Sequence, residues 1–244
     1  MIGDPEFYIP LLIFGAFAAA FVSGAIGFAD ALILNAVWLH IMDPVSAIPL
    51  VVTSGIFMHF TPLYKLRTTL DFSRLPPFVL FGVIGVPIGV YALGYASPDL
   101  FKKTVAVFLI FYGIWMFARP NTNIGEIGGK AVDSVIGFSG GIMGGFAGLS
   151  GLMPTIWSGL RGWPRNTQRG VYQLFVVAMH ALTIITFAFS GLITTSTLID
   201  LAYCAPAIII GSWLGVKIYP LLNDDLFKKI MLGLIFLSGV TLLI

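Results

Sequence analysis

Long apolar runs with few charges constrain this chain more than any motif in it. Of its 244 residues, 58% are hydrophobic and only 10% are charged, whereas about a quarter of the residues are charged in a typical soluble protein. That is too little charge to cover a surface in water, while lipid favours an apolar surface everywhere outside the loops. The sequence therefore predicts a multi-pass protein of the lipid bilayer and excludes a soluble domain with a catalytic site of its own.

Eight apolar tracts alternate with short segments that hold most of the charges. The tracts are residues 7–41, 45–63, 75–96, 101–117, 135–160, 171–193, 198–219 and 227–244. We expect helices, because open strands in lipid leave backbone groups unpaired and the tracts lack the two-residue alternation of barrel strands. The expected fold class is an all-α polytopic membrane protein.

The first tract is too long for one straight crossing. At 1.5 Å per residue, about 35 helical residues extend roughly 50 Å, against a hydrocarbon core of about 30 Å. Glycines supply a break at Ser23–Gly27, and the fifth tract has the same device at Gly148–Gly151, shortly before Pro154. Each broken tract either crosses the membrane once or folds back as a re-entrant segment.

The chain resembles itself at two related offsets. Segment 99–103 recurs letter for letter as 225–229. The other matched pairs are Gly85 with Gly211, Gly89 with Gly215, Gly24 with Gly148, Gly27 with Gly151, and His59 with His180. The pattern predicts two repeated units of about four tracts each, residues 1–119 and 133–244, joined by a linker at 120–132. The repeats are inverted if the broken tracts re-enter and parallel if they do not, and the charge bias of the loops does not decide between these.

Duplicated units with broken helices at matching places are typical of secondary transporters, whose substrate site lies near the membrane midplane. Each break exposes backbone N–H groups at the start of a half-helix, where the positive dipole end can hold an anion. The alternative is that the glycines only allow close helix packing. The substrate-site residues expected from the breaks are Gly24, Gly27, Gly148, Ser150 and Gly151.

The two glycine-broken segments, Phe21–Asp30 and Gly145–Pro154, resemble the repeated signature of the sulfite exporter TauE/SafE family of permeases. Segment Gly162–Gln173 is similar to a form found in some members, and the resemblance covers nearly the whole chain. The first copy departs from the family pattern, because Phe28-Ala29-Asp30 stands where a run of glycines is usual. The resemblance implies transport of sulfite, organosulfonates or related small organic anions across the inner membrane of a prokaryotic cell.

Four polar residues share one face of the sixth tract. Tyr172, Gln173 and His180 follow Arg169 at i+3, i+4 and i+11. A guanidinium there could pair with a sulfonate or carboxylate through two hydrogen bonds, and Tyr172 and Gln173 could add others. The alternative is that Arg169 reaches the membrane interface in a row with Arg161 and Arg165.

Three titratable groups fall inside the tracts. His59 and His180 could face one shared cavity as repeat-related rings, or each could be a packing residue. Asp30 could bind a coupling proton or cation, could neutralise Arg169, or could cap the second half-helix. If transport is coupled to protons, we expect the histidines to titrate, because the reference pKa of histidine is about 6.5.

Other functions find no support in the sequence. Three histidines and one cysteine have no spacing typical of a metal site, and no nucleophile or metalloprotease motif occurs. We therefore expect no cofactor, no metal, no enzymatic activity and no nucleic-acid partner. A passive anion channel and a non-transporting membrane scaffold stay open as alternatives, and so does a homodimeric assembly.

Overall fold

The computed structural model describes residues 5–27, 29–66, 72–118, 125, 127–218, 233, 236–237 and 239–243. Within them the regular elements are all helices, as predicted. The described helices are α1 (Pro5–Ile26), α2 (Asp30–Trp38), α3 (Pro44–Leu66), α4 (Pro76–Tyr95), α5 (Pro98–Ala118), α6 (Gly129–Ala147), α7 (Leu152–Leu160), α8 (Arg165–Phe189) and α9 (Thr195–Ile218). Residues 239–243 are also helical, whereas the predicted repeat copy at 225–229 lies outside the described residues.

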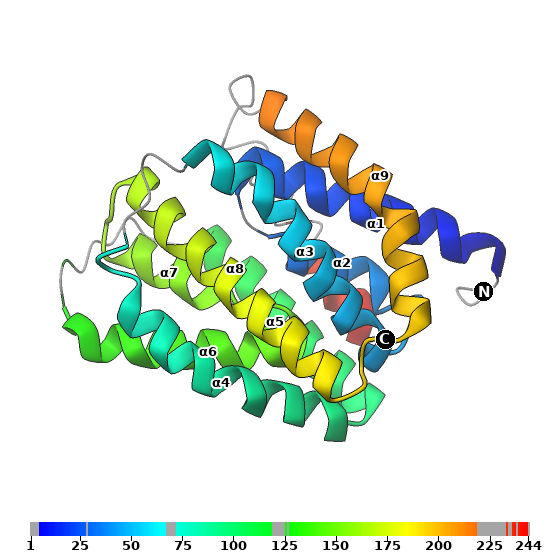
Figure 1. The fold of residues 1–244 in the computed structure, drawn as a ribbon, viewed down its shortest axis with the longest axis horizontal. Helices are drawn as coiled ribbons and strands as arrows, with labels where there is room; N and C mark the ends of the chain where they lie inside the picture. The colour runs from blue at the N-terminus through cyan, green and yellow to red at the C-terminus, as the bar shows by residue number, and fades with distance from the viewer. Residues whose placement is uncertain are drawn as a thin grey trace.

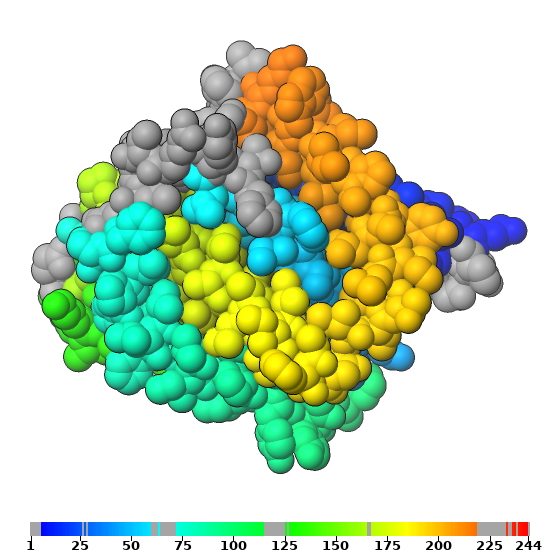
Figure 2. All heavy atoms as spheres, viewed as in Figure 1, coloured from blue at the N-terminus to red at the C-terminus, as the bar shows by residue number. Residues whose placement is uncertain are grey.

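The outer surface of the protein is apolar. Four described helices, α1, α4, α8 and α9, are long and apolar enough to cross a membrane. Large hydrophobic side chains on α4 and α9 are exposed, among them Leu80, Ile84 and Ile209. Figure 2 shows the surfaces of α4 (turquoise) and α9 (yellow to orange) on one face of the molecule. In water such a surface would be unfavourable, so the structure agrees with a multi-pass membrane protein.

Both predicted breaks are present. The first tract is divided into α1 and α2, and the fifth into α6 and α7. Gly27 follows α1 with φ +90°, and Gly148 follows α6 with φ +72°. Glycine is favoured at such helix ends because side chains rarely adopt a positive φ. The fifth tract also begins earlier than predicted, because α6 starts at Gly129, inside the expected linker.

The predicted register between the two breaks is wrong by three residues. We paired Gly27 with Gly151, but Gly151 has an ordinary helical φ of −72° and occupies the N-cap position of α7. Gly148 is the residue that ends its helix in the left-handed conformation, as Gly27 does. The corrected offset is the one that relates His59 to His180.

Each break is the tip of a helical hairpin. The Trp38 indole, at the end of α2, donates a hydrogen bond of 3.2 Å to the carbonyl of Leu12, near the start of α1. Likewise Arg161, just after α7, pairs with Asp133 in the first turns of α6 at 3.1 Å. The shorter helix of each pair therefore runs back along the longer one.

Two close helix pairs hold the hairpins in place. Figure 1 shows α9 beside α1 and α6 beside α4. Both pairs are packed through glycines: a Cβ on Gly215 would overlap the Phe21 carbonyl, and one on Gly145 would overlap the Val86 carbonyl. Gly24 belongs to this packing, because a Cβ there would lie 2.6 Å from the Ser212 carbonyl oxygen. The position of Gly24 therefore agrees with the alternative that the glycines allow close helix packing, here against α9.

Candidate functional site

A cavity of about 30 Å³ lies where the two hairpin tips meet. By its size it has room for about two water molecules. The residues around it come from both breaks, from α3 and from α8. They are Ala29, Asp30, Ala31, Leu32, His59, Gly148, Leu149, Gly151, Leu152, Tyr172, Val176 and His180.

Asp30 and His59 form a buried pair in the wall of this cavity. Asp30 Oδ2 lies 3.3 Å from His59 Nε2, and both side chains are almost fully buried. Asp30 is the first residue of α2, while the N-cap position belongs to Ala29, which has φ +79°. The capping role considered for Asp30 is therefore wrong. Among the described residues, the basic group beside the Asp30 carboxylate is the His59 imidazole of α3.

His180 approaches the same pair from α8. Its Nε2 lies 3.3 Å from the carbonyl oxygen of Gly148, and its ring centre lies 6.0 Å from that of His59. Gly55 allows this approach, because a Cβ there would lie 2.8 Å from His180 Cε1 and 3.2 Å from Asp30 Oδ2. Both histidines thus face one cavity, from two different helices.

Arg169 and Tyr172 lie against the tip of the first hairpin. A Cβ on Gly27 would lie 2.6 Å from Arg169 Nε and 2.7 Å from the Tyr172 hydroxyl. Arg169 sits one turn inside α8, which begins at Arg165. The Arg169 side chain is therefore placed beside the break rather than at the outer end of its helix.

Gln173 and Ser150 are buried but do not line the cavity. Within the described part of the chain, neither the Gln173 amide nor the Ser150 hydroxyl has a hydrogen-bond partner. A Cβ on Gly144 of α6 would lie 2.9 Å from the Ser150 Cβ, so Ser150 packs against its own hairpin. Buried polar groups of this kind are usually bonded to water or to a ligand.

Asn35 is a contact between the hairpins that the sequence analysis missed. Its Nδ2 donates to the carbonyl of Ala147 at 2.9 Å and to that of Ala31 at 2.7 Å. The first bond satisfies a carbonyl at the end of α6, where intrahelical partners run out. An asparagine in the middle of an apolar tract was a signal that could have identified it.

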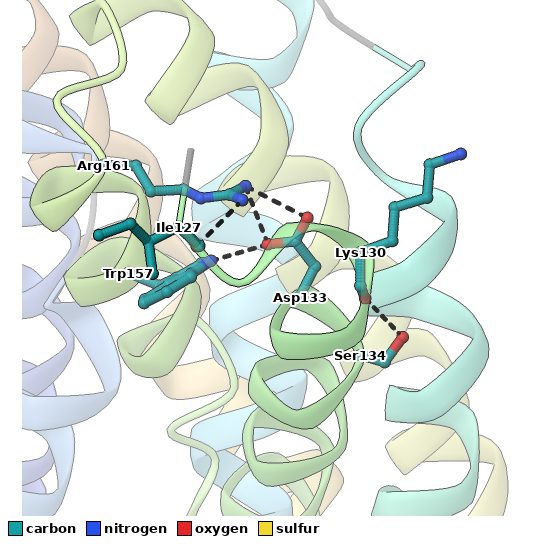
Figure 3. A network of polar contacts seen from close by, with 6 residues as sticks. All are labelled: Ile127, Lys130, Asp133, Ser134, Trp157 and Arg161. Carbon is teal, nitrogen blue, oxygen red and sulfur yellow. Dashed lines mark hydrogen bonds and ion pairs between the residues drawn. The ribbon is translucent and has the colours of Figure 1, made fainter. Parts of the chain in front are cut away.

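A second polar network holds the far end of α7 (Figure 3). Asp133 Oδ1 accepts a hydrogen bond of 2.7 Å from the Trp157 indole and one of 3.1 Å from Arg161 Nη1, and Arg161 Nη2 lies 3.4 Å from the Ile127 carbonyl. Arg161 is only 5% exposed. Arg161 is therefore not part of the interfacial row of arginines that was the alternative for Arg169. In the described residues, no group of three or more His, Cys, Asp or Glu side chains is arranged to hold a metal ion.

Comparison with known proteins gives one match. The family model described as sulfite exporter TauE/SafE matches residues 11–242, a range that includes both hairpin tips and every residue around the cavity. Neither curated proteins nor solved structures give a match. The family match confirms the resemblance of the two glycine-broken segments, and the chain belongs to the sulfite exporter TauE/SafE family of membrane transport proteins.

Proposed function

We propose that the protein is a secondary transporter that binds a small sulfur oxyanion or organosulfonate between the two hairpin tips. One observation carries the proposal: the first residues of both half-helices, α2 and α7, line the same cavity. Unpaired N–H groups at the start of a helix favour an anion, and two such ends facing one space reinforce each other.

The side chains around the tips fit an oxyanion. The Arg169 guanidinium beside Gly27 can donate two parallel hydrogen bonds to a sulfonate, and the Tyr172 hydroxyl can donate a third. Asp30 Oδ2 lies 3.3 Å from His59 Nε2, and a protonated imidazole there would offset its negative charge. A cavity of about 30 Å³ suits a small ion, so a substrate with a longer organic group requires the tips to move apart.

The hairpins also suggest how the substrate is reached. We propose that α2 and α7 are re-entrant, and that residues 1–119 and 133–244 form two inverted repeats. The return of each short helix along its longer partner supports this arrangement. Small movements of one hairpin against the other would then open the cavity to either side of the membrane in turn.

Flux measurements in proteoliposomes test the proposal against its rivals. Purified protein is first screened by thermal shift against sulfite, isethionate, sulfoacetate, taurine, lactate and sulfate. The compounds that bind are then followed as labelled substrates, with and without an imposed pH gradient. Accumulation against a concentration gradient supports a proton-coupled carrier, downhill flux alone supports a passive channel, and absence of both binding and flux supports a non-transporting scaffold.

A further inference from the structure

The cavity contains an unusual balance of charges for a site that takes an anion. Asp30 is an acid at the entrance of α2, where an anionic substrate would otherwise meet only N–H groups. Arg169 lies beside Gly27 and is not among the residues that line the cavity. With neutral histidines the lining therefore carries the one negative charge of Asp30 before any substrate arrives.

Among the described residues, the rest of the lining supplies no further full charge. The titratable side chains among the described residues that line the cavity are Asp30 of α2, His59 of α3, and Tyr172 and His180 of α8. The hairpin of α6 and α7 contributes only glycine and leucine side chains to the lining. A monovalent anion that enters would therefore meet the uncompensated negative charge of Asp30 in a buried place, which is unfavourable.

The Asp30–His59 pair can accept the compensating proton. The two groups are 3.3 Å apart and nearly inaccessible to solvent. Within the described part of the chain, neither Asp30 Oδ2 nor the His59 nitrogens have a partner that meets hydrogen-bond criteria. Protonation of His59 turns this loose contact into an imidazolium–carboxylate pair, with one N–H directed to Asp30 and the other left for the substrate.

We propose that Asp30 and His59 are a proton-binding site, which takes up one proton with each monovalent anion so that the negative charge of Asp30 is balanced while the anion is bound. The inference rests on the proposed function and adds the coupling ion, its site and its stoichiometry. The proton comes from water on the side where the anion enters and leaves with it on the other side. Transport is then electroneutral symport.

His180 has a different role in this scheme. Its Nε2 faces the Gly148 carbonyl, and only a nitrogen that carries hydrogen can bond to a carbonyl. One neutral tautomer therefore already satisfies this contact. His180 acts as a positioning residue that fixes the second hairpin tip beside the proton site.

The first test counts protons on the unmodified protein. Isethionate and methanesulfonate are the probes, because a sulfonate keeps one negative charge across the accessible pH range. Purified protein in weakly buffered detergent solution is titrated with each probe while pH is recorded. We expect uptake of about one proton per anion bound near neutral pH, as linkage between the two ligands requires. In proteoliposomes, a pH gradient should drive accumulation, while a potassium-diffusion potential alone should not.

Variants then assign the proton to its residues. Asp30→Asn removes the negative charge, so anion binding should persist and become independent of pH, and counterflow should persist while gradient-driven accumulation is lost. His59→Gln should lose proton uptake as well. His180→Gln keeps a hydrogen-bond donor, so flux should fall while the ratio of protons to anions stays the same. His40→Gln, outside the cavity, is the matched control and should behave like the unmodified protein.

The outcomes separate the two proposals. If neither probe and no compound of the thermal-shift screen binds or exchanges in the unmodified protein, the proposed function fails and this inference fails with it. If the probes bind and exchange without proton uptake, only the proton site is wrong. Uptake that persists in Asp30→Asn and His59→Gln, or disappears in His180→Gln alone, would also overturn the assignment. Size-exclusion elution identifies misfolded variants, and the proton count on the unmodified protein does not depend on them.

Discussion

The two hairpin tips have the same backbone and different chemistry. Both helices that lead into the tips end at a glycine with positive φ, Gly27 in one and Gly148 in the other. The first tip carries an acid at the start of its half-helix and touches Arg169. At the matching position of the second tip stands Gly151, which offers only backbone. The comparison shows that the scaffold is nearly symmetric, whereas the charged groups gather on one side of the cavity.

The hairpins also differ at their far ends. The end of α2 is held by a neutral hydrogen bond from Trp38 to a backbone carbonyl. The end of α7 is held by the buried ion pair of Asp133 and Arg161, with Trp157 as a second donor (Figure 3). In the second hairpin the charged pair therefore lies far from the cavity and holds the two helices together. In the first hairpin the charged group lies at the tip. Four predictions test this division.

The largest effect is expected for alanine at the tips. Gly27→Ala should abolish substrate binding and flux, because the new Cβ would lie 2.6 Å from Arg169 Nε and φ is +90°. Gly148→Ala should cost about 1–2 kcal/mol of stability from its backbone conformation, besides a close contact of 2.7 Å with Val51 Cγ1, and should retain binding because Val51 does not line the cavity. Radioligand binding and thermal unfolding measure the two effects.

A control for the tip substitutions is available in α4. Gly94→Ala places a Cβ where the structure has nothing within 4 Å, and it should leave both binding and stability unchanged. Equal loss of binding in Gly27→Ala and Gly148→Ala would show that the tips do not differ in function.

The ion pair of the second hairpin should dominate stability. Asp133→Ala leaves the Arg161 charge buried without its carboxylate, and we expect a loss of roughly 3–5 kcal/mol. Asp99→Ala is the matched control, because its pair with Lys103 is exposed and such pairs contribute only about 0.5 kcal/mol. Unfolding in a mild detergent compares the two. Similar losses in both variants would contradict the anchoring role.

The arginine at the first tip should affect affinity rather than stability. Arg169→Lys keeps the charge but loses the planar fork, so binding should weaken by about 1–3 kcal/mol, or roughly five- to 150-fold. Arg74→Lys is the control: the Arg74 guanidinium lies over the Trp163 ring and does not line the cavity, so this substitution should leave affinity unchanged. Unchanged affinity in both Arg169→Lys and Arg169→Ala would remove Arg169 from the substrate site.

The smallest effect concerns the indole donors. Trp38→Phe should cost about 1 kcal/mol, the usual value of a neutral hydrogen bond, besides the change in packing. Trp157→Phe should cost more, about 2 kcal/mol, because its acceptor is the Asp133 carboxylate. Thermal unfolding of the two variants under identical conditions makes the comparison, and the reverse order would contradict the assigned difference between the hairpins.

The sequence predicted the helices and both breaks well, because apolar length and glycine clusters act locally. It did not distinguish Gly148 from Gly151 as the helix end, since only the backbone conformation of the folded chain selects one of several neighbouring glycines. His59 and His180 were correctly singled out as a pair on one cavity wall, although their roles there are still proposals.

Long-range polar contacts were the main omission. The sequence analysis did not pair Asp133 with Arg161, because residues 28 positions apart meet only once α7 folds back along α6. Asn35 was missed for the same reason: its partner, the Ala147 carbonyl, lies 112 positions away in sequence. Spacing within one helix predicts a shared face, but it does not indicate which other segment the face will meet.

The glycine-packed helix pairs have a consequence for synthesis in the cell. α1 pairs with α9, and α4 pairs with α6, so each close contact joins an early segment to a late one. When a ribosome has completed residues 1–118, α1 and α4 are in the lipid, but their partner helices α9 and α6 have not yet been synthesised. The nascent protein cannot mature half by half, and assembly must wait for α9 to enter the membrane. A chain cut between α5 and α6 should for the same reason be stable only when both fragments are made in the same cell.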